Sequence, residues 1–125
     1  KGHANAIATE PFDYSLLWAA NSKLDADAAI AAARANDALF SINHPANSGR
    51  GWEYPFADHN GAFVADTLEV WNGPWRIPSR NHVATLEKWD DLLIQGLRVN
   101  AVGGSDSHQL RGIQSHFNLH GAPTT

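Results

Sequence analysis

The order of apolar and polar positions along the chain predicts alternating helices and strands. Asp25 can cap a helix over residues 25–35, whose many alanines have high helix propensity. The short apolar run 38–42 then predicts a strand. We expect this strand to stop at Asn43-His44-Pro45, because a residue that precedes proline is pushed out of the helical region.

The second half of the chain repeats this alternation. Residues 67–71 predict a second strand, and Ser79 is a plausible cap for a second helix. The apolar positions of that helix recur at helical spacing: Val83, Leu86, Trp89 and Leu93. Gly96 should end the helix, and residues 97–102 predict a third strand.

Strands that alternate with helices favour a parallel α/β sheet or barrel. Residues 46–66 are rich in Gly, Asn and aromatic residues without clear periodicity, which indicates a long loop of the kind that is usually functional or mobile. Three or four strands with two helices would form part of a barrel with open sheet edges, through which the chain could self-associate.

Composition limits the possible partners. The net charge of −4 argues against a nucleic-acid partner, and no apolar run approaches the roughly 20 residues of a membrane-spanning helix. The chain lacks cysteine, which excludes disulfides and thiolate zinc sites. It also lacks methionine, so Lys1 is not a translation start, and we expect an N-terminal part to be missing. The absence of a visible signal peptide leaves the compartment open between cytoplasm and periplasm.

Polar residues that could bind a metal follow the expected strands. His44 follows the first strand, Glu69 lies near the end of the second, and Asp106 and His108 follow the third. Active sites of parallel α/β barrels form at these carboxyl ends. Carboxylate oxygen and imidazole nitrogen are ordinary ligands of zinc, manganese and iron. The pattern therefore predicts a metal site.

The Asp106-Ser107-His108 spacing has a geometric reason of its own. In an extended backbone, residues i and i+2 project to the same side, so the carboxylate and the imidazole can converge. Gly103 and Gly104 would let the chain turn tightly and approach a ligand closely.

Each candidate also has a purely structural interpretation. His44 could stabilise a turn, Glu69 could be a solvent-exposed strand residue, and Asp106 with His108 could form a polar turn. Their common position at strand ends favours the metal site. His82, in the first turn of the second helix, is expected to face solvent.

Three further residues are candidate substrate contacts. Arg50 and Arg111 could bind an anionic substrate group, although a surface arginine is an equally good interpretation of each. Trp52 belongs to an aromatic stretch, residues 52–56, which either anchors the long loop or lines a pocket. A non-catalytic module that binds carbohydrate or a hydrophobic ligand through these aromatics is the alternative function from a different class.

Five stretches in order make the chain resemble the polymerase and histidinol phosphatase (PHP) superfamily. Within it, the chain is most similar to the CehA/McbA-type metallohydrolases. The matching stretches are Gly2-His3-Ala4-Asn5-Ala6, Ile42-Asn43-His44-Pro45, Leu68-Glu69-Val70-Trp71-Asn72-Gly73, Trp89 through Gly96, and Gly103-Gly104-Ser105-Asp106-Ser107-His108.

The resemblance implies that residues 1–125 are the C-terminal portion of a distorted (β/α)7 TIM-like barrel, a single partial domain. It implies two or three Zn, Mn or Fe ions in the complete domain. Members hydrolyse phosphoesters, and one branch hydrolyses carbamate esters, so a small-molecule ester is the expected substrate.

The resemblance also assigns roles to individual residues. His3 and His44 would bind one metal, Asp106 another and His108 a third, and through these metals Asp106 and His108 would be catalytic. Glu69 matches a frequent family position that is not among the usual ligands. The remaining ligands would lie upstream of Lys1.

Overall fold

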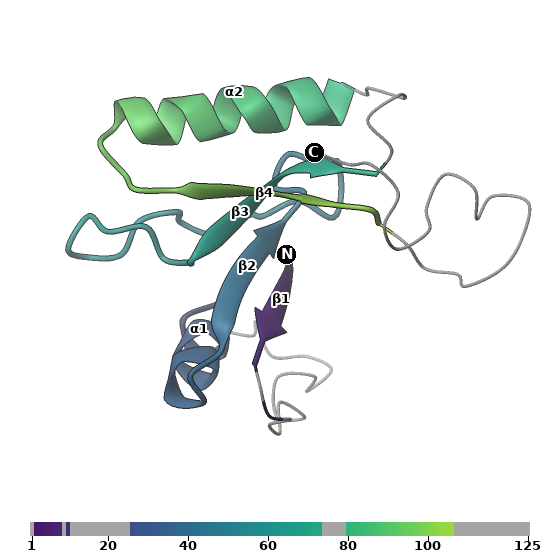
Figure 1. The fold of residues 1–125 in the computed structure, drawn as a ribbon. Coiled ribbons are helices and arrows are strands. Elements are labelled where there is room, and N and C mark those ends of the chain that lie inside the picture. Colours follow the sequence, from purple (N-terminus) through teal and green to yellow (C-terminus); the bar gives the residue numbers. More distant parts are fainter. Residues whose placement is uncertain (1, 9, 11–25, 74–79, 107–125) are drawn as a thin grey trace, which may run out of the picture.

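The computed structural model describes residues 2–8, 10, 26–73 and 80–106 of the chain (Figure 1). These residues form a mixed α/β unit with a four-stranded sheet and two helices. The elements in chain order are β1 (His3–Ile7), α1 (Ala26–Ala35), β2 (Leu39–Asn43), β3 (Thr67–Asn72), α2 (Arg80–Ile94) and β4 (Asn100–Gly104). Both expected helices and the strands around residues 40 and 69 are thereby confirmed.

The sheet is mixed, which corrects the expectation of a parallel sheet. Its strand order is β1-β2-β3-β4, with β2, β3 and β4 parallel and β1 antiparallel to β2. The antiparallel register pairs His3 with Asn43, so the beginning of β1 lies beside the end of β2. Residue 3 therefore reaches the same edge of the sheet as the residues that follow β2.

The last strand also differs from its prediction. β4 begins at Asn100 rather than at Leu97, and Leu97 and Val99 are buried in the core before the strand starts. Gly103 and Gly104, expected to form a turn, are the last two residues of β4 and pair with Trp71 and Asn72.

Both helices end in the same backbone geometry. After α1, Asp37 has a φ of 52° and the N–H of Ala38 donates to the carbonyl of Ala33. After α2, Gly96 has a φ of 85° and the N–H of Leu97 donates to the carbonyl of Leu92. These bonds satisfy carbonyls that a helix end leaves free, and they confirm the predicted stop at Gly96.

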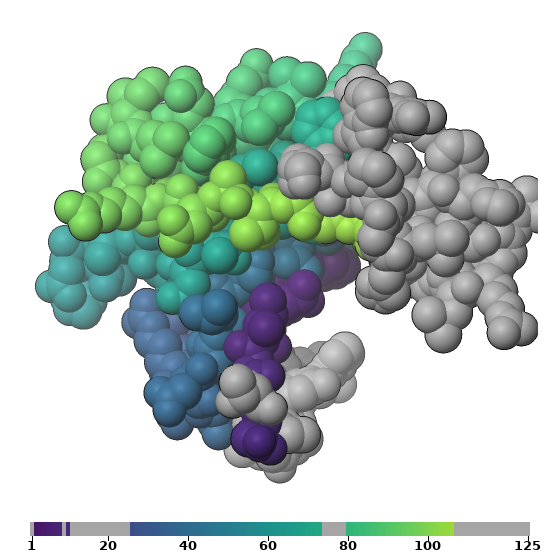
Figure 2. Space-filling model, viewed as in Figure 1, coloured from purple at the N-terminus to yellow at the C-terminus, as the bar shows by residue number. Residues whose placement is uncertain are grey.

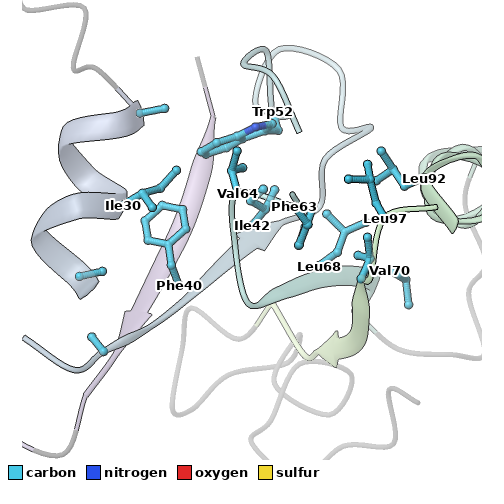
Figure 3. Close-up of a cluster of buried hydrophobic side chains, with 14 residues drawn as sticks. Ile30, Phe40, Ile42, Trp52, Phe63, Val64, Leu68, Val70, Leu92 and Leu97 are labelled. Atoms are coloured by element: carbon cyan, nitrogen blue, oxygen red, sulfur yellow. The ribbon is translucent and has the colours of Figure 1, made fainter. Parts of the chain in front are cut away.

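One hydrophobic cluster joins both helices to the sheet (Figure 3). It extends from Ile30 of α1 through Ile42 and Leu68, which are fully buried, to Leu92 of α2. Side chains alternate between the two faces of a strand, so the face that carries Ile42 and Leu68 packs against the helices. Ser41 and Glu69 belong to the opposite face.

Residues 44–66 contain no helix or strand, as predicted, but they are tied by local hydrogen bonds. Ala57 and Phe63 form an isolated antiparallel bridge around a tight turn. Inside this turn, Oδ1 of Asp58 accepts the N–H groups of Asn60 (2.8 Å) and Ala62 (2.9 Å). Phe63 and Val64 then enter the core.

Within the described residues, β1 and β4 each pair with one other strand only. Figure 2 shows β4, in yellow-green, along the surface of this view, with part of β1 in purple below it. Neither described helix has the length and apolarity that crossing a membrane requires.

Replacing Ile42 with Ala should lower the free energy of unfolding by about 2–5 kcal/mol, because the side chain is 0 % exposed and its removal leaves a cavity. Ile94→Ala is the matched control, since Ile94 is 76 % exposed, and should change stability by less than about 0.5 kcal/mol. Denaturant unfolding of both variants measures this. Equal losses would contradict the assignment of Ile42 to the core.

The turn at Asp58 should contribute stability that depends on pH. The backbone N–H groups of Ala62 and Asn60 lower the pKa of Asp58 below its ordinary value of 3.8. A carboxyl group with a lowered pKa stabilises the folded state when ionised, and this contribution is lost as the pH falls through the lowered pKa. Asp58→Asn keeps an oxygen acceptor and should remove this part of the acid sensitivity. NMR titration of the Asp58 carboxyl group in the unsubstituted chain measures its pKa, and a value at or above 3.8 would contradict the prediction.

Candidate functional site

Two imidazoles meet at the edge of the sheet where β2 ends and β1 begins. The rings of His3 and His44 lie 5.0 Å apart between centroids, edge to face at 70°. The antiparallel register of β1 produces this proximity, because it pairs His3 with the residue directly before His44. The resemblance to the PHP superfamily implied that both residues bind one metal, and the structure brings their rings together.

The backbone of His44 is held in an unusual conformation. Its φ is 29°, in a region that residues other than glycine rarely adopt. Its N–H donates to Oε2 of Glu69 at 2.8 Å, across from β2 to β3. In the ring, Nδ1 is buried and has no hydrogen-bond partner in the described part of the chain.

Glu69 is a buried carboxylate and not the solvent-exposed strand residue that was the alternative. It is 8 % exposed, and the side-chain amide of Asn72 donates to both of its oxygens at 3.3 Å. Burial raises the pKa of Glu69, while the hydrogen bonds from Asn72 and the His44 backbone lower it in part. The carboxylate is thus bound from two directions.

Asp106 follows the end of β4 and is exposed. Its charge adds to the upward shift of the Glu69 pKa, whereas the charge of His44 opposes the shift. The imidazoles of His3 and His44 and the carboxylate of Glu69 therefore lie at the carboxyl edge of the parallel strands. Imidazole nitrogen and carboxylate oxygen are donor types that divalent transition metals bind.

Gly104 makes the close approach of β4 to Glu69 possible. The β3–β4 register shifts between Glu69 and Trp71, and a Cβ on Gly104 would collide with Oε1 of Glu69. The N–H of Gly73 donates to the carbonyl of Gly104 at 2.7 Å, which holds the two strand ends together. Glycine is thus required here for contact with a carboxylate and not for a turn.

The geometric argument for Asp106 and His108 does not hold at Asp106. Its φ is 52°, so the backbone is left-handed and not extended, and the rule that i and i+2 share a side does not apply. His108 and Arg111 lie outside the described residues, so the roles predicted for them stay predictions.

The described residues do not form a complete cluster of metal ligands. Within residues 2–8, 10, 26–73 and 80–106, no three His, Cys, Asp or Glu side chains are arranged to hold one ion. The pair of His3 and His44 nevertheless fits a metal in chemical type, and the buried Nδ1 of His44 is a polar atom that lacks a partner among these residues.

The two candidate substrate contacts within the described range have different environments. Arg50 is exposed in the turn that follows His44-Pro45. Trp52 is buried, packs edge to face on Phe40 with a centroid distance of 6.1 Å, and donates its indole N–H to the carbonyl of Pro55 at 3.3 Å. Of the two roles considered for Trp52, these contacts support anchoring of the loop.

A hollow of about 700 Å³ lies between α1 and the loop at residues 54–64. Its lining includes Tyr54, Arg34 and Asp58. Arg34 donates to the carbonyl of Val64 at 3.2 Å, and Asp58 accepts the N–H groups of its own turn. These two polar groups therefore have structural roles in the loop.

His82 was wrongly expected to face solvent. It is buried, stacks on Trp71 with a centroid distance of 4.4 Å and an angle of 26°, and its Nε2 lies 2.5 Å from the carbonyl oxygen of Asn72. Its partners are on the preceding strand, ten or more residues away, so helical position alone gave no signal of them. His82 thus contacts Asn72, whose side-chain amide binds Glu69.

No family model matches this chain, and neither does any curated protein or solved structure. The resemblance to the PHP superfamily therefore rests on the motifs of the sequence.

Replacing Gly104 with Ala should destabilise the protein by about 1–3 kcal/mol, because the new methyl group would collide with Glu69. The sign of this change in stability is informative, since alanine in a strand ordinarily gives a protein more stability than glycine does, by about 0.5–1 kcal/mol. In a Glu69→Ala background the collision partner is gone, and Gly104→Ala should be neutral or stabilising. Denaturant unfolding of the four proteins gives the coupling free energy. Additive effects would refute the contact.

Proposed function

We propose that this chain is part of a metal-dependent hydrolase of the PHP type, similar to the CehA/McbA branch, acting on phosphoesters or related esters. The observation that carries the proposal is the 5.0 Å approach of the His3 and His44 rings beside the buried carboxylate of Glu69. These groups lie at the carboxyl edge of β2, β3 and β4, where α/β barrels form their active sites.

The arrangement of the sheet supports the proposal that residues 1–125 are one partial domain, the C-terminal portion of a distorted TIM-like barrel. Both helices contribute to one core on one face. On the other face, Ile7 and Leu39 are cross-strand partners and are 57 % and 53 % exposed. Parallel sheets are normally covered on both faces. In a closed barrel, this second face would become the interior, and β1 or β4 would continue into the missing strands.

The residues of the site would have different roles. His3 and His44 would bind one ion as neutral imidazoles, Asp106 would bind another, and His108 a third. Bound Zn, Mn or Fe, two or three ions in the complete domain, would lower the pKa of a water molecule and polarise the scissile group. Arg50 and Arg111 would contact an anionic group of a small-molecule ester.

The expected alternatives differ in their support. A carbamate or carboxyl ester would use the same metal ligands, so a panel of phosphate, carbamate and carboxyl esters separates these substrates. A non-catalytic aromatic-loop module would need exposed rings, and the burial of Trp52 argues against it. Such a module would purify without stoichiometric transition metal and would tolerate a chelator.

His44→Ala should weaken zinc binding by at least about tenfold, because it removes one of the two imidazoles proposed to bind one ion. His59→Ala is the matched control: this imidazole is exposed in the loop and should leave zinc binding unchanged. Competition titration of the purified chain with a zinc indicator measures the affinity. Zinc binding by His44→Ala equal to that of the unsubstituted chain would contradict the proposed site.

A further inference from the structure

We propose that Glu69 is a positioning residue, whose carboxylate fixes the backbone of His44 so that its imidazole is held beside that of His3 to bind a metal ion. This inference rests on the proposed function, and it adds the residue that orients one of the ligands. The contacts of three successive strand ends carry it.

The first step is the conformation that must be held. His44 has a φ of 29° and is followed by Pro45. A side chain with a Cβ is disfavoured at positive φ, and a following proline restricts the backbone further. An unsupported His44 would therefore relax toward extended conformations, which would move its ring away from His3. The structure opposes this with a hydrogen bond from the His44 N–H to Oε2 of Glu69 at 2.8 Å.

The second step is the rigidity of the acceptor. Glu69 is buried, and the amide of Asn72 donates to both of its oxygens. On the β4 side, Gly104 approaches so closely that even a Cβ there would collide with Oε1. Asn72 is in turn fixed through its carbonyl oxygen, which lies 2.5 Å from Nε2 of the buried His82. The carboxylate is therefore confined by protein contacts alone.

The third step separates positioning from ligation. Oε2 of Glu69 already accepts two N–H groups, from His44 and Asn72. Oε1 accepts the amide of Asn72 and faces Gly104. Both oxygens thus have protein partners, whereas Nδ1 of His44 has none among the described residues. In this arrangement Glu69 acts on the metal through His44.

Two conservative variants separate this role from a purely electrostatic one. Glu69→Gln keeps the length of the side chain and one oxygen for the His44 N–H, but removes the charge. Glu69→Asp keeps the charge but is one methylene shorter, so it cannot reach the same N–H without moving β3. Positioning predicts that Gln substitutes well and Asp poorly. Attraction of the cation by charge, or direct ligation through a carboxylate oxygen, predicts that Gln fails.

The first measurement uses the metal-free chain. Hydrogen exchange of the His44 backbone amide, followed by NMR, should accelerate by about tenfold in Glu69→Asp, because the shorter side chain no longer reaches this N–H and the hydrogen bond is lost. In Glu69→Gln the change should be much smaller. The amides of Ile42 and Leu68, in the centre of the sheet, serve as internal references. If exchange in Glu69→Asp is faster throughout the sheet, Asn72→Ala is used instead. This variant removes only the amide that donates to Glu69, and it should speed exchange at His44.

The second measurement is zinc titration of the same proteins. The affinity should fall by about 10–100-fold in Glu69→Asp, the usual effect of losing a group that orients a ligand. It should fall less than about tenfold in Glu69→Gln. Cobalt substitution adds a spectroscopic check, because a displaced imidazole changes the visible absorption bands of the bound ion.

The outcomes distinguish this inference from the proposed function. If the unsubstituted chain binds zinc but Glu69→Gln binds as weakly as Glu69→Asp or more weakly, positioning is wrong and the proposed function stands. Unchanged exchange at His44 in Glu69→Asp would also overturn positioning. If the unsubstituted chain takes up no zinc, the proposed function fails, and the inference about a metal ligand fails with it.

Discussion

The hydrogen bond from the backbone of His44 to the buried carboxylate of Glu69 is the interaction on which the candidate site depends. It joins the end of β2 to β3 at the point where the chain leaves the sheet. It also holds His44 at a positive φ, which directs the imidazole toward His3 on the neighbouring antiparallel strand. Glu69 can take this position only because Gly104, at the end of β4, has no side chain. The contacts of this one carboxylate thereby hold together the ends of β2, β3 and β4, next to the beginning of β1.

The two faces of the sheet separate stability from chemistry. Ile42 and Leu68 are fully buried on the face that both helices cover, in the one core of the described residues. The opposite face carries Ser41 and Glu69, and it ends at the two imidazoles. A buried carboxylate costs free energy, as the raised pKa of Glu69 indicates, and is tolerated only with hydrogen-bond donors directed at it. Its cost is offset by the core on the other face.

Local patterns in the sequence predicted the elements and the parallel direction of β2, β3 and β4, but not the antiparallel pairing of β1. Helical periodicity and Gly96 gave the second helix and its end, because these signals lie within one segment. The direction of β1 and the burial of His82 were missed, since both depend on partners on other elements. Glu69 was left between two interpretations for the same reason, as the group it binds is 25 positions earlier in the chain. The strand-end rule did identify His44 and Glu69 as neighbours, and the PHP motifs paired His3 with His44.

A crystal structure of the zinc-loaded chain, with anomalous scattering at the zinc edge, tests the central claim most directly. The account predicts a zinc peak about 2 Å from an imidazole nitrogen of His3 and of His44. It also predicts that the carboxylate of Glu69 accepts the His44 N–H in the zinc-loaded chain. A zinc ion bound directly by Glu69, or bound away from both imidazoles, would contradict it.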